Sequence, residues 1–470
     1  MVFSSAVFLF VFFPLTMILY FIPARNEEKD ISRKNLILCI ASLIFYAWGE
    51  PVYIVLMCLS IFFNFHLGLD MENHRSNPKK MKHLLIFGIV FNMFMLGFFK
   101  YSGFVVENIN AIFGLKIDYE GLPLPVGISF YTFQILSYVI DVYNGLVRAN
   151  TKIVNFAAYI TMFPQLIAGP IVQYKDIEKQ LQHRTITIDS FYDGIIWFIK
   201  GLGKKVLFAN TIGAVYSDIS AGGFKEVSAV TAWICIICYT LQIYFDFSGY
   251  SDMAVGLGKM FGFEFVQNFN YPYKSSSIKD FWSRWHISLS SWFRDYVYIP
   301  LGGNRKGLAR TIFNTFVVWA LTGLWHGAAW NFIAWGMFYG VLLIVEKYLL
   351  KNLLDRIPIV LRHIGTLIVV MIGWVFFSST SMTEAMDFIG ALVGMGGSFI
   401  DSQAKFLLSE NLFAIFAMSL SAVGVFEMIS TREETRVYKA LKSVMYFVIF
   451  ILCIAYLVSE TYNPFLYFRF

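Results

Sequence analysis

The sequence predicts an all-α protein that crosses a membrane many times. Hydrophobic residues make up 57% of its 470 positions and charged residues 14%, with a mean hydropathy of +0.62. A soluble domain carries about 25% charged residues. Long runs such as 2–22 and 444–458 contain no charge at all, and roughly 20 apolar residues cross a bilayer. Because every backbone polar group must be satisfied within lipid, these runs are expected to be helices.

Apolar segments follow one another along the whole chain. They span residues 2–22, 36–49, 51–69, 84–99, 122–145, 153–172, 192–217, 227–266, 308–325, 327–346, 361–379, 384–398, 410–429 and 440–458. Some are too short to cross fully, so we expect about a dozen transmembrane or re-entrant helices at ~20 residues each. The first run lacks preceding basic residues and a small-residue cleavage site, which favours a retained helix over a signal peptide. We therefore expect residues 1–470 to form a single integral membrane domain.

The basic residues lie in short loops between the apolar segments. The net charge is +6, and this placement indicates contact with anionic lipid or ligand and not with nucleic acid. Arg33 and Lys34 follow the first run, and Lys79 and Lys80 follow the third. This bias predicts an outside N-terminus with both loops in the cytoplasm. The five cysteines are scattered, and Cys235 and Cys238, which stand in an apolar stretch, indicate buried thiols, with no metal site or disulfide framework.

His326 is the first catalytic candidate. It alone can titrate near neutral pH in the apolar stretch 312–345. Ionisable groups at membrane depth are costly and often mark function, but a neutral histidine bonding between helices would be structural. The residues alone leave both interpretations open. Desolvation favours the neutral imidazole, and Gly323 and Gly327 leave space beside it. Such a base could remove the proton of a hydroxyl that attacks a thioester.

A second candidate region, Lys279–Lys306, combines tryptophans with cations. Its polar candidates are His286, Arg284, Arg294, Arg305 and Lys306. An interfacial amphipathic helix would explain all of this stretch except the histidine. The segment Gly302–Lys306 supplies flexible backbone and two cations that could hold phosphates.

Four strings in the chain resemble the membrane-bound O-acyltransferase family in their order and spacing. They are M-F-P-Q-L-I-A-G-P-I (Met162–Ile171), D-F-S-G-Y-S-D-M-A-V-G-L-G (Asp246–Gly258), F-W-S-R-W-H-I-S-L-S-S-W-F-R-D-Y-V-Y-I-P-L-G-G-N-R (Phe281–Arg305) and G-L-W-H-G-A-A-W-N-F (Gly323–Phe332). The resemblance implies a helical ring around a central tunnel, in which an acyl group passes from a cytoplasmic thioester to a hydroxyl. His326 matches the family's invariant histidine, the base. His286 matches its second polar active-site position, and Trp325 and Asn331 stand in the last string as further binding candidates.

The I-P-L-G-G-N-R continuation and the long C-terminal region are more similar to the bacterial alginate O-acetylation branch of this family. That resemblance implies acetyl-CoA as the donor, entering from the cytoplasm near Arg305 and Lys306, with no bound cofactor and no metal. It implies an exopolysaccharide or cell-wall polymer as the acceptor and a separate extracytoplasmic acetyltransferase as a partner. The expected location is the cytoplasmic (inner) membrane of a bacterium, with many passes through the lipid.

Three other functions remain open. Proteins that transfer D-alanine to teichoic acid-type polymers share the W-H-I-S-like and W-H-G strings, which makes D-alanyl transfer the alternative enzymatic function. Midplane polar groups between broken helices are also typical of transporters, although no internal repeat supports one. A scaffold that recruits the extracytoplasmic transferase is the last alternative.

Overall fold

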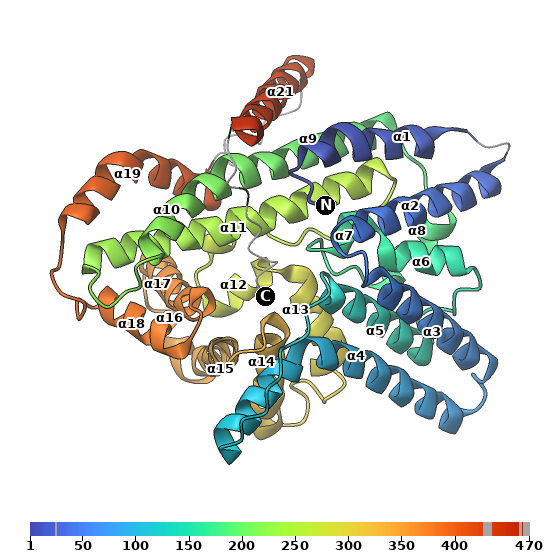
Figure 1. Ribbon diagram of the computed structural model, residues 1–470, viewed down its shortest axis with the longest axis horizontal. Helices are drawn as coiled ribbons and strands as arrows, with labels where there is room; N and C mark the ends of the chain where they lie inside the picture. Colours follow the sequence, from blue (N-terminus) through green and yellow to red (C-terminus); the bar gives the residue numbers. More distant parts are fainter. Residues whose placement is uncertain (24–25, 426–434, 460–462, 464–470) are drawn as a thin grey trace. The chain divides into compact units, whose positions relative to one another are not determined.

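Helices make up all regular structure in the described part of the chain. The computed structural model describes residues 1–470 apart from 24–25, 426–434, 460–462 and 464–470 (Figure 1). The predicted all-α class is confirmed for these residues. They divide into two units, Met1–Phe198 with Ser251–Val266 and Ile199–Tyr250 with Gln267–Phe470.

The first unit holds the N-terminal helices. They are η1 (Phe8–Phe12), α1 (Phe13–Phe21), α2 (Glu27–Gly49), α3 (Ile54–Asn73), α4 (Pro78–Phe113), α5 (Ile128–Asn144), α6 (Ile153–Thr161), α7 (Phe163–Leu166), α8 (Tyr174–Gln182) and most of α9 (Ile188–Gly203). The N-cap side chains of Asn26 and Asn77 accept backbone N–H bonds at the starts of α2 and α4. Asparagine is among the preferred N-cap residues, so these two long helices begin within the predicted basic loops.

The second unit holds both catalytic candidates. Its helices are η2 (Lys204–Ala209), α10 (Asn210–Ser220), most of α11 (Ala229–Met260), η3 (Pro272–Lys274), α12 (Ile278–Arg284), α13 (Ile287–Phe293), η4 (Arg294–Tyr298), α14 (Leu308–His326), α15 (Trp330–Val345), η5 (Glu346–Leu350), α16 (Lys351–Leu354), α17 (Ile359–Ser378), α18 (Met382–Leu392), α19 (Ser402–Ala422) and α21 (Arg436–Ser459). Cys235 and Cys238 on α11 are both buried, as the apolar surroundings of this pair predict.

Eight helical segments of the described residues are long and apolar enough to cross a bilayer. They are Lys29–Gly49, Ile54–Asn73, Pro78–Phe113, Ala229–Met260, Trp330–Leu354, Ile359–Ser378, Ser402–Ala422 and Val437–Ser459. Other predicted apolar segments form helices outside this group of eight, among them Phe8–Phe21, α5 and α14. Residues 426–429 of the expected segment 410–429 lie outside the described residues. The predicted number of about a dozen therefore includes full-length and shorter helices.

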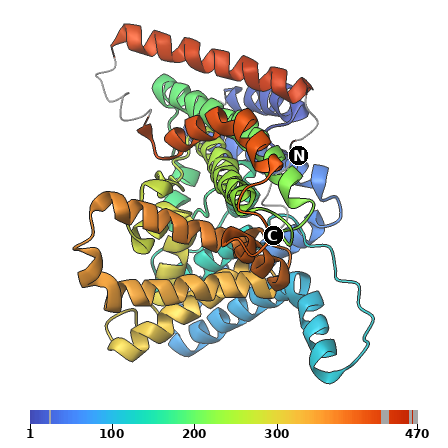
Figure 2. The ribbon, with the colours of Figure 1, turned by 90° about the vertical axis from the view of Figure 1, so that its left-hand side faces the viewer.

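Two glycines bring α14 and α15 into backbone contact. A Cβ on Gly323 would collide with the Phe332 carbonyl, and one on Gly336 would collide with the Trp319 carbonyl. Small residues permit this close approach between membrane helices. Helix α14 ends at His326, and extended backbone at Gly327 and Ala329 turns the chain into α15. Helices α14, α15 and α17 run side by side, coloured from gold to orange in Figure 2, and His326 at the end of α14 contacts Trp335 of α15 and Phe377 of α17.

Substitution of Gly336 by alanine should separate α14 from α15. The added methyl has no space beside the Trp319 carbonyl, and overpacking of this kind costs about 1–3 kcal/mol. We expect a lower midpoint of thermal unfolding in detergent than for the wild type. Gly365→Ala on α17 is the matched control, because nothing lies within 4 Å of its new methyl. Equal midpoints for the two variants would contradict the packing argument.

Candidate active site

His326 is enclosed by aromatic rings. Its side chain ends α14 and is 5% exposed. The imidazole lies 5.0 Å from the Trp325 ring, 5.0 Å from the Trp335 ring and 5.1 Å from the Phe377 ring, each measured between centroids and each near perpendicular. Edge-to-face contacts of this kind favour a fixed ring orientation. The enclosure creates the apolar, water-poor surroundings that the sequence predicts for this imidazole.

His286 occupies a break between α12 and α13. Its backbone has φ 45° and ψ 55°, a left-handed conformation that is uncommon for residues other than glycine. Two backbone hydrogen bonds to the segment 268–270 secure the break: the Ile287 N–H donates to the Asn268 carbonyl (3.0 Å), and the Asn270 N–H donates to the Arg284 carbonyl (2.9 Å). Unusual backbone conformations concentrate at functional sites, so this position is a candidate on geometry as well as on sequence.

The hydrogen bonds of Asn268 determine which ring nitrogen of His286 carries the proton. The Asn268 Oδ1 accepts from the Ser288 N–H (3.1 Å) and the Ser288 hydroxyl (2.9 Å), which identifies that atom as the oxygen. His286 Nδ1 lies 3.2 Å from the same oxygen and must therefore be the donor. Its Nε2 is left as an acceptor, and it is buried without a hydrogen-bond partner among the described residues.

Burial also fixes the charge of His286. This residue is 1% exposed and lies outside the eight candidate spans. Desolvation lowers its pKa to about 3, because a low-dielectric environment disfavours the charged imidazolium. The side chain is consequently neutral near pH 7 and offers a lone pair at Nε2.

Trp325 connects the two histidines. Its indole ring contacts His286 at 5.9 Å and His326 at 5.0 Å between centroids, and the residue is 3% exposed. The structure thus brings the predicted residues Trp325, His286 and His326 together in one aromatic region of the second unit. Among the described residues, no group of three or more His, Cys, Asp or Glu side chains could hold a metal ion.

Two predicted arginines are already engaged by neighbouring carboxylates. Arg284 Nε donates to Asp280 one turn earlier (2.8 Å), and Arg294 Nε donates to Asp295 (2.8 Å). The bond to Asp295 raises the pKa of Arg294, whose side chain is 62% exposed. Both arginines therefore already have local ionic partners, which fits the interfacial alternative better than a role at the imidazoles.

The other predicted binding residues lie at two different places. Arg305 and Lys306 are exposed on the loop before α14, beside Asn304, which lines a cavity of about 710 Å³. Neither of these two cations is among the residues that line that cavity. Asn331 is buried, and its amide donates to the carbonyls of Phe376 (3.2 Å) and Ser379 (2.8 Å), so it joins the start of α15 to the end of α17.

Asn268 is a site residue that sequence reasoning missed. It lies 18 positions before His286, in the polar string Q-N-F-N (Gln267–Asn270) between two aromatic-rich stretches. A buried asparagine can fix a histidine tautomer only if the two meet in the fold. The one feature of the sequence that could have indicated Asn268 is the position of this polar string directly after the apolar segment 227–266.

Known proteins resemble the chain over most of its length. The model of the membrane-bound O-acyltransferase family matches residues 146–384. A protein of Pseudomonas aeruginosa named probable alginate O-acetylase AlgI is 42% identical over 400 residues, which cover 84% of this chain and 75% of that protein. A peptidoglycan O-acetyltransferase of Helicobacter pylori is 35% identical, with 84% of this chain and 80% of that protein covered. A teichoic acid D-alanyltransferase of Bacillus subtilis is 28% identical over 54% of this chain and 69% of its own length.

The matched region includes both histidines, the Trp325 contact and the α14–α15 pair. Eight apolar helical segments accompany it, so the chain is a multi-pass membrane protein. The alignments with the two O-acetylating relatives each cover 84% of the chain, more than the matched region alone. The chain belongs to the membrane-bound O-acyltransferase family and is an acyltransferase.

Proposed function

We propose that this protein transfers acetyl groups from a thioester to hydroxyls of an envelope polymer, in the cytoplasmic membrane of a bacterium. The observation that carries the proposal is the pair of buried imidazoles, His286 and His326, that both contact Trp325. Residues of both units lie within the region matched by the family model. The whole chain, residues 1–470, acts in this proposal as one acyltransferase domain.

His326 serves as the general base of the transfer. Its imidazole takes the proton of the attacking hydroxyl, the hydroxyl oxygen forms a bond to the thioester carbon, and the carbon–sulfur bond breaks. The proton then passes to the thiolate, so the products are an acetyl ester and a free thiol. Aromatic enclosure supports this role, because a desolvated imidazole is neutral and able to accept a proton.

His286 holds the acceptor in place. The hydrogen bond from its Nδ1 to Asn268 leaves Nε2 able to accept and unable to donate. It can therefore receive a hydrogen bond from a hydroxyl next to the attacking one, as a polyol acceptor would provide. It cannot polarise the thioester carbonyl through Nε2, since that would require an N–H.

Acetyl-CoA is the donor in this proposal and approaches from the cytoplasm. The basic loop with Arg305 and Lys306 precedes α14, and His326 ends that helix. At 1.5 Å per residue, the 19 residues of α14 extend over about 27 Å, close to the ~30 Å of a bilayer's hydrocarbon core. This separation suits a donor that arrives on one side and an acceptor that arrives from the other.

An extracytoplasmic acetyltransferase is the proposed partner, and the polymer is an exopolysaccharide or a cell-wall component. The names of the two O-acetylating relatives support acetate as the transferred group and such a polymer as the final acceptor. D-alanyl transfer is the second candidate function, favoured only by the more distant D-alanyltransferase match.

Replacement of His326 by alanine should abolish the transfer. With labelled acetyl-CoA and the purified full chain, we expect thiol release to fall by about 10²–10⁴-fold, the contribution typical of a positioned base. His83→Ala is the matched control, since that histidine is exposed near the start of α4 in the other unit. Thiol release that persists in the His326 variant would remove this residue from the mechanism. A wild-type protein that releases no thiol would favour a transporter or scaffold.

Replacement of Asn268 by aspartate should change the pH dependence of transfer. The carboxylate keeps an acceptor for Nδ1–H but adds a negative charge, which raises the pKa of His286 above its depressed value of about 3. His286 would then become protonated as the pH falls, and Nε2 would lose its lone pair. We expect activity measured between about pH 5 and 8 to decline at a higher pH than in the wild type.

The variant Asn268→Ala is the control for this experiment. It removes the acceptor oxygen without adding charge, so it should lower activity at every pH and leave the position of the acidic limb unchanged. Coincident profiles and rates for the wild type and the aspartate variant would show that Asn268 does not position His286.

Deletion of the gene should remove acetate from the envelope. Mild alkali releases ester-linked groups, and we expect the deletion strain to release less acetate and an unchanged amount of D-alanine. Complementation with the wild-type gene should restore the acetate, and complementation with His326→Ala should not. A selective loss of D-alanine would favour the alternative acyl group.

A further inference from the structure

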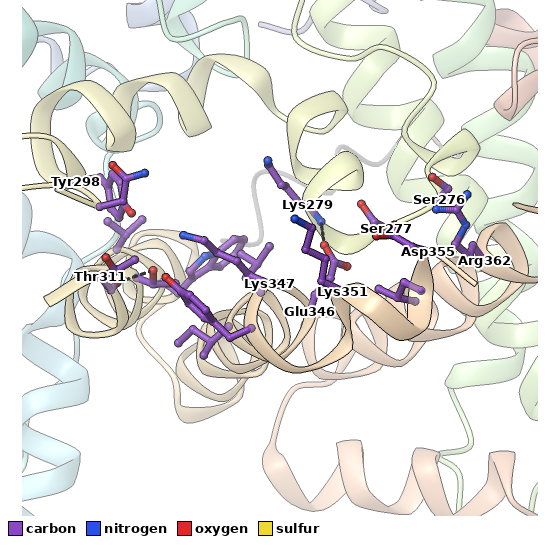
Figure 3. A pocket seen from close by; sticks show the side chains of 18 residues that line it. Ser276, Ser277, Lys279, Tyr298, Thr311, Glu346, Lys347, Lys351, Asp355 and Arg362 are labelled. Carbon is purple, nitrogen blue, oxygen red and sulfur yellow. Dashed lines mark hydrogen bonds between the residues drawn. The ribbon is translucent and has the colours of Figure 1, made fainter. Parts of the chain in front are cut away.

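A cavity of about 710 Å³ in the second unit is surrounded at its mouth by four cations. They are Lys279 of α12, Lys347 of η5, Lys351 of α16 and Arg362 of α17. Figure 3 shows Lys279 and Lys347 reaching into the same hollow from different helices. None of the four was singled out in the sequence, because they come from three segments that lie far apart along the chain: α12, the continuous helix Trp330–Leu354 and α17.

The four cations outnumber the two carboxylates, Glu346 and Asp355, that line the same cavity. Among the described residues, no ion pair within 4.0 Å joins any of them to a carboxylate. Glu346 also lines the cavity, but its carboxylate accepts the backbone N–H groups of Ile278 (2.6 Å) and Lys279 (3.1 Å). The Nε of Arg362 is buried without a hydrogen-bond partner. The mouth therefore has unused donors and a surplus of positive charge.

Glu346 has a second consequence for the geometry. Glu346 binds the first turn of α12 and so fixes the position of Lys279 relative to η5. Lys347 follows Glu346 on η5 and lines the same cavity as Lys279. Lys351 follows Lys347 by four residues, and positions four apart share one helix face. The three ammonium groups are thus gathered at one opening.

The interior of the cavity has a different chemistry. Thr311, Thr315 and Trp319 line it from one stripe of α14, and Leu343 and Ile344 line it from α15. Trp319 contacts Trp282 at 4.6 Å and Trp335 at 6.2 Å between ring centroids. Trp335 in turn contacts His326. Seven residues of helix, about 10 Å, separate Trp319 from His326.

We propose that this cavity binds the acyl donor, with its phosphates at Lys279, Lys347, Lys351 and Arg362 and its thioester arm along α14 toward His326. The assignment rests on the proposed function and adds the residues that recognise the donor. Several phosphates match several unpaired cations, whereas a neutral flexible arm matches the threonine, leucine and tryptophan interior. The aromatic rings of Trp319 and Trp335 stand between the cavity and His326, so the arm must displace them to react.

Binding measurements can test this assignment apart from catalysis. The full chain in neutral-lipid nanodiscs would be titrated with coenzyme A and with pantetheine, which lacks the phosphates. For Lys347→Gln/Lys351→Gln we expect the Kd for coenzyme A to rise at least about tenfold, as two lost charged hydrogen bonds imply. The Kd for pantetheine should not change. Lys225→Gln/Lys405→Gln is the matched control, because it removes the same charge from exposed lysines of the same unit.

Three results would overturn the assignment. One is a Kd for coenzyme A that is equal in both double variants. Another is an equal loss of pantetheine affinity, which would mean that the phosphates are not recognised. The third is a Lys347→Gln/Lys351→Gln variant with an unchanged Kd for coenzyme A that retains less anionic lipid when the nanodiscs are made with such lipid. That result would assign the cations to lipid headgroups, which carry the same phosphate chemistry.

The variant His326→Ala separates this inference from the proposed function. It should bind coenzyme A as the wild type does while releasing no thiol. If the wild type binds coenzyme A through these lysines but transfers nothing, the proposed function fails and the binding site stands. If transfer depends on His326 but coenzyme A binds equally well without the two lysines, the assigned binding site is wrong and the proposed function stands.

Discussion

The backbone contact between α14 and α15 determines where His326 lies and what surrounds it. Gly323 and Gly336 let the two helices approach so closely that a methyl group at either position would meet a carbonyl oxygen. Trp335, one residue before Gly336, packs against the imidazole, and Phe377 of α17 closes another side. The same contact therefore positions the imidazole and keeps water from it, and a change that loosens one property would loosen the other.

The second imidazole is controlled by polar contacts in place of close helix packing. A left-handed conformation at a residue such as His286 costs on the order of 1–3 kcal/mol, and three bonds to the Asn268 side-chain oxygen with one to its carbonyl offset that cost. The result is a neutral ring with a defined tautomer. A buried acceptor nitrogen with this orientation would be lost if the chain relaxed to an ordinary helix through residue 286.

Local sequence predicted the parts of this arrangement that depend on local chemistry. Apolar runs predicted the helices, and the gap between the predicted segments 308–325 and 327–346 lies at His326, where α14 ends. The engagement of Arg284 could also have been predicted, since Asp280 stands four residues earlier on the same helix. Asn268 could not be paired with His286, nor Lys279 with Glu346, because these contacts join residues 18 and 67 positions apart. Only the fold brings such residues together.

The separation between the cations that line the cavity and the aromatic region around His326 suggests how a charged substrate can react at an uncharged site. Phosphates are expensive to remove from water, so they would remain at the open mouth, where Lys347 and Lys351 are exposed. Only the neutral arm and its thioester can enter the aromatic region around Trp319 and His326 without that cost. Solvent access alone would then orient the donor, with its acyl end toward the base. A base exposed to water could not impose this orientation, because the phosphates could then approach it without losing their hydration.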